Sequence, residues 1–178
     1  MEPALLSRQL RRGSGTLLQR RRWASGLSLF AAGSMGVIAL YQLGIIKHLP
    51  DPPLPYFDSD KVDASEEAYA VFATPDAVLG LTNYGVTMVL GAMGGQNRAL
   101  ERPWIPLAWT LKALVDAAQA ARLTRNQWTK HRAFCIWCLA AAAATFATVP
   151  LTLPEAKVAA RHLMGSGGSG KPSVSPAA

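Results

Sequence analysis

Cysteine is scarce in this sequence of 178 residues, which has only Cys135 and Cys138. So small a number excludes the disulfide framework that stabilises many small secreted domains. Charged residues are scarce as well, at 16% of the chain, whereas half of the residues are hydrophobic. A composition this apolar excludes an intrinsically disordered chain, and the length allows one folded domain.

The longest stretch without a charged residue runs from Trp23 to Ile46. At about 1.5 Å per helical residue, it can cross a hydrocarbon core of about 30 Å. A cleaved signal peptide is the alternative for this segment, because Arg20, Arg21 and Arg22 precede it and resemble a twin-arginine signal. Three further apolar segments follow. The sequence therefore predicts an all-α fold, an integral membrane four-helix bundle with spans at about 23–46, 76–95, 103–121 and 133–153.

Two of these segments carry signals of local helix geometry. Thr74 is expected to cap the second helix, with Pro75 at the first helical position. The third segment contains Lys112 and Asp116, which are four residues apart and are therefore expected to face each other on one side of a helix. They form either an ion pair that orients the helix or a contact for protons or substrate.

The segments after the fourth span have a different composition. Pro150 and Pro154 are expected to kink or end the fourth helix. Residues 154–165 then predict a short interfacial helix that stops at Gly165. Residues 166–178 are rich in Gly, Ser and Pro and predict a flexible tail or a linker.

The distribution of charge predicts the orientation in the membrane. Residues 1–22 form a basic head with six arginines and one carboxylate, whereas Lys47 to Asp76 has seven carboxylates and two lysines. The positive-inside rule therefore places both termini in the cytoplasm, the loop 47–75 outside and the cysteines near the outer face. Four basic residues between positions 122 and 132 oppose this assignment, and they keep the inverted orientation or a three-span variant open.

The chain has a net charge of +7, and the distribution of this charge indicates which class of molecule binds the basic head. A nucleic-acid-binding module would combine basic and aromatic residues on one surface, and the basic head does not. We therefore expect membrane lipid with anionic head groups as the partner of the head, and no nucleic acid.

Cys135 and Cys138 form a Cys-Ile-Trp-Cys motif at the start of the fourth span. Two thiols at this spacing can approach as a disulfide, and the amino end of a helix stabilises the thiolate that disulfide exchange requires. Two alternatives are small buried hydrophobic residues and half of a metal site. Because His131 alone leaves zinc short of four ligands, no metal is expected.

These features together resemble the vitamin K epoxide reductase family. The likeness covers about residues 23–153, and its most specific parts are Pro75 to Leu81 and the Phe-Cys-Ile-Trp-Cys-Leu motif at 134–139. The resemblance implies a bacterial-type, multi-pass cell-membrane protein, with four helices around a pocket for a menaquinone, ubiquinone or phylloquinone. It also implies that the thiol pair passes electrons between a thioredoxin-like partner and that membrane quinone. Cys138 would then face the quinone, and Cys135 would exchange disulfides with the partner.

The resemblance also has a departure. Family members usually carry a second cysteine pair in the loop after the first span, and residues 47–75 contain no cysteine. Two functions therefore stay open. The first is a quinone-linked membrane thiol-disulfide oxidoreductase whose partner reacts with Cys135 directly. The second is a non-enzymatic small subunit or assembly factor of a larger membrane complex that keeps the disulfide as a structural link.

Four residues are candidates for quinone contacts, and each has a structural alternative. Asp76 lies at the start of the second helix, where it would hydrogen-bond a quinone oxygen if protonated, or simply interact with the helix dipole. Asn83, Tyr84 and Trp137 would line an apolar pocket with a few polar contacts, or the aromatic rings would anchor the chain at a membrane boundary.

The loop between the first two spans begins with prolines and continues with acidic residues. Its proline-rich start disfavours a helix. Residues 63–72 predict a short amphipathic helix over the mouth of the bundle, with Tyr69 and Phe72 buried beneath it.

Overall fold

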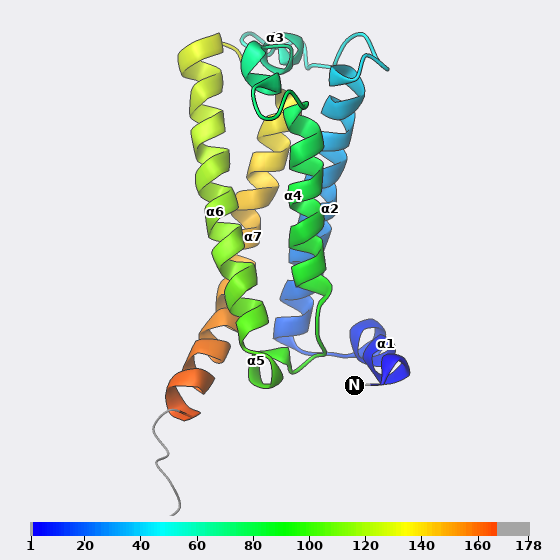
Figure 1. Ribbon diagram of the computed structural model, residues 1–178, viewed down its shortest axis with the longest axis vertical. Coiled ribbons are helices and arrows are strands. Elements are labelled where there is room, and N and C mark those ends of the chain that lie inside the picture. The colour runs from blue at the N-terminus through cyan, green and yellow to red at the C-terminus, as the bar shows by residue number, and fades with distance from the viewer. Residues whose placement is uncertain (1, 167–178) are drawn as a thin grey trace, which may run out of the picture.

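The computed structural model describes residues 2–166, and these residues form an all-helical fold without a β-strand, so the all-α prediction is confirmed. Four long helices lie side by side (Figure 1). They are α2 (Thr16–Gln42), α4 (Asp76–Ala92), α6 (Trp104–Asn126) and α7 (Ile136–Ser166). The predicted tail beyond residue 166 lies outside the described residues.

Short elements close the two ends of the bundle. Figure 1 shows α1 (Pro3–Arg12) and α5 (Arg98–Glu101) at one end, which we call the basal end. The opposite end carries α3 (Ser59–Asp63) and the 3₁₀ helix η1 (Glu66–Tyr69) within residues 47–75, which we call the cap. A π-helical turn, η2 (Gln127–His131), follows α6.

The first long helix starts and ends earlier than the predicted span 23–46. It begins at Thr16 and includes basic residues of the predicted head because Arg21 finds acceptors inside the fold. The Arg21 guanidinium donates hydrogen bonds to the carbonyls of Gly95 at 3.0 Å and Gly94 at 3.3 Å. At the other end, the helix stops before Gly44, whose φ of +75° favours glycine.

The last helix is longer than predicted. It passes through Pro150 and Pro154 without a break, so the separate helix predicted at 154–165 is wrong. The physical reason is that residues just after Pro154 pack against the rest of the protein. Glu155, Ala156 and Ala159 are all buried there, and this packing offsets the cost of a proline inside a helix.

Small side chains let α2 and α7 approach closely. Ala31 of α2 packs with Ala141 and Ala144 of α7 in a buried cluster. Helix pairs with small residues at their interface gain van der Waals contact between their backbones. This packing gives the bundle a close central pair of helices, on which α4 and α6 rest.

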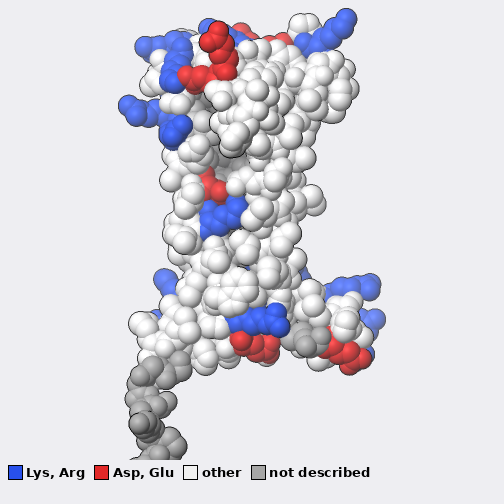
Figure 2. All heavy atoms as spheres, in the orientation of Figure 1, with Lys and Arg blue, Asp and Glu red and all other residues white. Residues whose placement is uncertain are grey.

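A polar cluster joins α4 to α6. Lys112 and Asp116 face each other as predicted and form an ion pair, with 2.5 Å between Nζ and Oδ2. Lys112 also donates to Thr87 Oγ1 at 2.7 Å and to Asn83 Oδ1 at 3.1 Å. Figure 2 shows most charges gathered at the two ends of the molecule, with one blue-and-red spot between them on the visible face.

Two of the described helices are long and apolar enough on their own to cross a membrane. They are the segments Thr16–Gln42 and Ile136–Gly165. This criterion concerns length and composition only, so the four-span topology stays a prediction.

Candidate functional site

The two cysteines lie where α7 begins. Cys135 immediately precedes the helix and is fully buried, whereas Cys138 is half-buried in the first turn. The backbone N–H of Cys138 donates a hydrogen bond to Cys135 Sγ at 3.1 Å, and both thiols are free. An N–H at the start of a helix has no partner within the helix, so it is available to stabilise a thiolate on Cys135.

The cap is attached to the segment just before α7 by backbone hydrogen bonds. Phe134 N donates to Tyr56 O at 2.7 Å, and Asp58 N donates to Phe134 O at 3.1 Å. The Phe134 ring stacks on Trp128 with 5.6 Å between ring centroids. These contacts lay the cap over the cysteines and explain why Cys135 is inaccessible.

Ser59 ties the cap to the helix through its side chain. Its hydroxyl donates to Asp51 Oδ1 at 2.6 Å and accepts a hydrogen bond from Ile136 N at 3.3 Å. Asp51 Oδ2 also accepts from Ser59 N at 2.7 Å. This cap is therefore held closed by polar contacts where the family resemblance leads us to expect a cysteine pair.

Asp63 is the carboxylate that lies against the thiols. Its side chain is buried at 3% exposure, and Oδ1 accepts a hydrogen bond from Cys138 Sγ at 3.5 Å. Oδ2 has no hydrogen-bond partner within the described part of the chain. Burial, followed by the neighbouring Cys135 sulfur, raises the pKa of Asp63 to about 9. The carboxyl is therefore protonated at neutral pH.

Gln42 at the end of α2 connects the cap to α4. Its Nε2 donates to Asp76 Oδ1 at 2.7 Å and to the Asp63 carbonyl at 3.1 Å, and its Oε1 accepts from Ala77 N at 3.1 Å. Neither Gln42 nor Asp63 was predicted from the sequence as a residue of the site. One signal was available for Gln42, which is a polar residue near the end of an otherwise apolar segment.

The four predicted quinone contacts do not meet in one place. Trp137 packs beside Cys138 at the cap, and its indole N–H donates to Pro50 O at 3.1 Å. Asp76 lies at the cap as well, through Gln42. Asn83 instead faces α6, where its Nδ2 donates to Asp116 Oδ1 at 3.1 Å.

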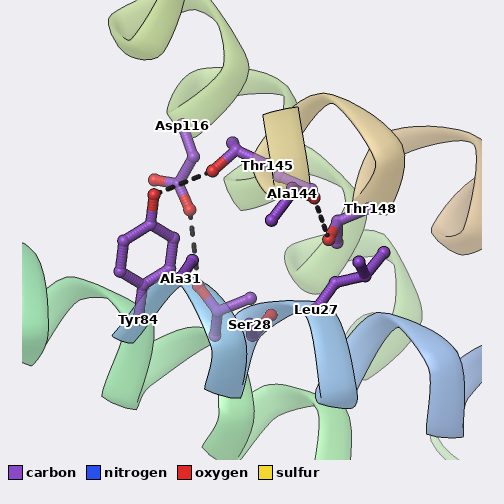
Figure 3. Close-up of a pocket in the computed structure, with 10 residues that line it drawn as sticks. Leu27, Ser28, Ala31, Tyr84, Asp116, Ala144, Thr145 and Thr148 are labelled. Carbon is purple, nitrogen blue, oxygen red and sulfur yellow. Dashed lines mark hydrogen bonds between the residues drawn. The ribbon is translucent and has the colours of Figure 1, made fainter. Parts of the chain in front are cut away.

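Tyr84 lines a small cavity inside the bundle (Figure 3). Its hydroxyl shares a 2.8 Å hydrogen bond with Thr145 Oγ1 and is 3.5 Å from the carbonyl of Ala141, which lies one helical turn beyond Cys138. The cavity volume is about 10 Å³, enough for a single water molecule and far too small for a quinone ring. A quinone can therefore approach these residues only if the packing opens.

The cap was predicted in part. Its proline-rich start is not helical, but the helix predicted at 63–72 is wrong, because α3 ends at Asp63 and η1 covers only Glu66–Tyr69. Phe72 is 91% exposed, with a φ of +54°, so it does not pack beneath the cap. Thr74 does not cap α4 either, because its hydroxyl donates to Phe72 O at 3.1 Å.

Three atoms at the site have the chemistry of metal ligands. An Asp63 carboxylate oxygen and the sulfurs of Cys135 and Cys138 all lie within 4.8 Å of one another. Three ligands of this kind leave a zinc ion one position short of a closed tetrahedral site. The same three atoms suit thiol–disulfide chemistry, because a sulfur pair and a protonated carboxyl can exchange protons and electrons within one buried cluster.

Comparison with known proteins gives one finding that bears on this site. The chain matches the model of the Vitamin K epoxide reductase family over residues 22–153, which is most of its length. No curated protein sequence matches it. The matched region includes the cap, both cysteines and all four long helices apart from their outer ends. The chain therefore belongs to the vitamin K epoxide reductase family.

Proposed function

We propose that this protein is a membrane oxidoreductase that oxidises its Cys135–Cys138 dithiol with a quinone. Family membership indicates a quinone-linked thiol oxidoreductase. The observation that supports this specific reaction is the pair of free thiols at the start of α7 beside the buried carboxyl of Asp63. In the reaction, the two thiols lose two electrons and two protons and form a disulfide, and the quinone takes up both to become a quinol.

Four membrane spans fit this reaction, because a quinone is dissolved in the lipid. Two helices can span a membrane by length and composition alone. The outer surfaces of α4 and α6 also expose large apolar side chains, as lipid-facing helices do. These side chains include Leu81, Val86, Val89, Leu111, Leu114 and Val115. We propose that the basal end, with its arginines, lies in the cytoplasm and the cap lies outside.

The quinone substrate is proposed to react at Cys138, which is a half-buried residue whereas Cys135 is fully buried. Trp137 and Asp76 are the nearest of the predicted contacts, and Asp63 Oδ2 is a buried polar atom without a partner beside them. The polar groups therefore fit a quinone oxygen, but the packing does not contain room for the ring. Movement of Trp137 and the cap would provide it.

The partner that delivers electrons is proposed to be a thioredoxin-like thiol protein on the cap side. It reacts at Cys135, which is fully buried. Residues 47–75 must therefore move away from Phe134 and Ile136 before a partner sulfur can reach Cys135, which requires loss of the backbone and Ser59 hydrogen bonds.

A single-turnover experiment tests the proposal. The protein is reduced, placed in liposomes without free thiol and mixed with a short-chain quinone. We expect one quinol per protein and simultaneous loss of both thiols. If quinone remains fully oxidised while the protein is folded, the proposal is wrong.

A second candidate function is a structural subunit of a larger membrane complex. The enclosure of Cys135 under a cap without cysteines favours it, because no internal thiol can reach the pair. This function predicts that the thiol pair keeps one redox state in the membrane whether or not quinone is added.

A further inference from the structure

Asp63 differs from the buried Glu155 and the half-buried Asp116, which both have a cation as partner. Glu155 is paired with Arg98, and Asp116 is paired with Lys112. Asp63 has no cation within ion-pair distance among residues 2–166, and Oδ2 lacks even a hydrogen bond. An unpaired buried carboxyl costs free energy, and such groups are found where a proton has to be moved.

The groups that face Asp63 explain why it keeps its proton. Cys135 and Cys138 face it from α7 and the segment before it, and Asp76 faces it from α4. Tyr41 of α2 is also within electrostatic range. Cys135 and Asp76 raise the pKa of Asp63, whereas the hydrogen bond from Cys138 lowers it. Its pKa of about 9 follows mainly from burial and then from Cys135.

The backbone holds the Asp63 carboxyl in place against Cys138. Asp63 is the last residue of α3, and the Gln42 amide holds its carbonyl at 3.1 Å. Oδ1 is thereby 3.5 Å from Cys138 Sγ, within reach for proton transfer after a small adjustment. Cys138 is also the sulfur that must leave when a thiolate attacks the disulfide at Cys135.

We propose that Asp63 is the acid–base residue of the thiol pair, protonating Cys138 when the disulfide is opened and recovering the proton as the cycle continues. This inference rests on the proposed function. In the first step, a thiolate of a dithiol reductant attacks Cys135 Sγ, the bond between Cys135 and Cys138 breaks, and Cys138 leaves with the electron pair. The Asp63 proton moves to Cys138, and the negative charge passes to the carboxylate.

The second step restores the carboxyl. The remaining thiol of the reductant attacks the mixed disulfide and releases Cys135 as a thiolate, and its proton returns to Asp63. The sum is one reductant dithiol oxidised to its disulfide and one protein disulfide reduced, with Asp63 unchanged. Cys138 leaves more readily when it is protonated in place, because the developing thiolate is neutralised as the disulfide bond breaks and the single negative charge moves to the carboxylate.

The test measures opening of the disulfide without quinone. Protein oxidised at Cys135 and Cys138 is mixed with dithiothreitol, and the appearance of thiols is followed from pH 6 to pH 10. We expect D63N to react about 100-fold more slowly than the wild type at neutral pH, which is the scale of general acid catalysis. The D63N rate should approach the wild-type rate at the alkaline end of this range, as Asp63 loses its proton.

Two variants serve as controls for this experiment. E66Q removes an exposed carboxylate from the same cap and should react as the wild type does. D63E should recover part of the rate, because it restores the carboxyl. The acid–base role of Asp63 is overturned if D63N opens its disulfide at the wild-type rate. It is also overturned if D63N is slower by a factor that does not change with pH.

A second measurement needs no Asp63 variant and covers the case in which D63N does not fold. Infrared spectroscopy of wild-type protein with ¹³C-labelled aspartate carboxyls should show a protonated carboxyl at pH 7 that ionises near pH 9, with D76N used to assign the band. Absence of a protonated aspartate at pH 7 overturns the proposal. Because neither experiment contains quinone, a failure of the quinone reaction alone would contradict the proposed function and leave the role of Asp63 standing.

Discussion

The two ends of the bundle differ in whether a buried ionisable group has a partner of opposite charge. At the basal end, Arg98 is fully buried and its guanidinium donates to both Glu155 oxygens at 2.8 Å. It also donates to the carbonyls of Leu90, Gly91 and Met93 and lies over the Trp109 ring at 5.0 Å. At the cap, the buried Asp63 carboxyl accepts one hydrogen bond, from Cys138 Sγ, and no cation pairs with it among the described residues.

This difference separates groups that stabilise the fold from groups that do chemistry. Burial of a charge costs several kcal/mol, and only complete pairing and hydrogen bonding offset that cost. The basal end meets this condition, so its charges hold α2, α5 and α7 together. The cap does not, so burial raises the pKa of Asp63 and leaves its carboxyl available to the neighbouring thiols.

The largest effect is expected for Cys138→Ala, which changes the chemistry of the thiol site beneath the cap and leaves the basal end intact. We expect quinone reduction to be abolished, because a disulfide can no longer form, while thermal unfolding in detergent is unchanged. Quinol formation is the measurement, with Cys138→Ser as a second variant of similar size. Retained turnover in either variant would show that Cys138 is not the reacting thiol.

The converse change breaks the basal end. Glu155→Gln should destabilise the protein by about 3–5 kcal/mol, because it leaves Arg98 and Arg21 buried without a negative partner. Denaturant unfolding in detergent measures the loss, and Glu101→Gln, an exposed carboxylate at the same end, is the matched control. Equal stability of the two variants would contradict the view that the basal pairing holds the fold.

A change at Gln42 tests how the cap is held. Gln42→Leu removes the hydrogen bonds to Asp76, Ala77 N and the Asp63 carbonyl, at a cost of about 1–3 kcal/mol. We expect maleimide to label Cys135 faster in reduced protein, because the cap opens more often. An unchanged labelling rate would mean that Gln42 does not control access to the thiol.

The pH dependence of stability distinguishes the two ends without changing the packing. Since the pKa of Asp63 is raised from 3.8 to about 9 on folding, the folded state binds more protons than the unfolded state between these values. Stability should therefore fall as pH rises through this range. The difference in unfolding free energy between wild type and D63N, measured at several pH values, should show this slope. A difference that does not vary with pH would contradict the raised pKa.

The smallest effect is expected in the middle of the bundle. Replacing Lys112 with Met and Asp116 with Leu together removes the polar link between α4 and α6. Hydrogen bonds between membrane helices contribute about 0.6 kcal/mol on average, so we expect a decrease of this order in unfolding free energy. A decrease as large as that for Glu155→Gln would show that pairing at mid-bundle is as important as pairing at the basal end.

Sequence patterns were sufficient where the signal was local. The uncharged stretch after Trp23 predicted a long helix, and the four-residue spacing predicted the ion pair of Lys112 and Asp116. The Cys-x-x-Cys spacing predicted two neighbouring sulfurs where a helix begins. Each of these features depends on residues within one helix or one turn.

Contacts between distant residues could not be read from the sequence. Asp63 reaches Cys138 across 75 positions, and Arg98 reaches Glu155 across 57. The partner of Glu155 also explains why α7 continues past Pro154, where a local rule predicted its end. Local rules describe isolated segments, whereas these outcomes depend on what each segment packs against.

A redox titration of Cys135 and Cys138 in membranes tests whether the thiol pair exchanges electrons with a quinone. The thiols are alkylated and counted by mass shift at a series of reductant concentrations, with and without added quinone. If the protein is a quinone-linked oxidoreductase, quinone will convert the dithiol to the disulfide, and a dithiol reductant will reverse the change. If the pair keeps one state under every condition, the protein is not a quinone-linked oxidoreductase, and its thiols serve only the structure.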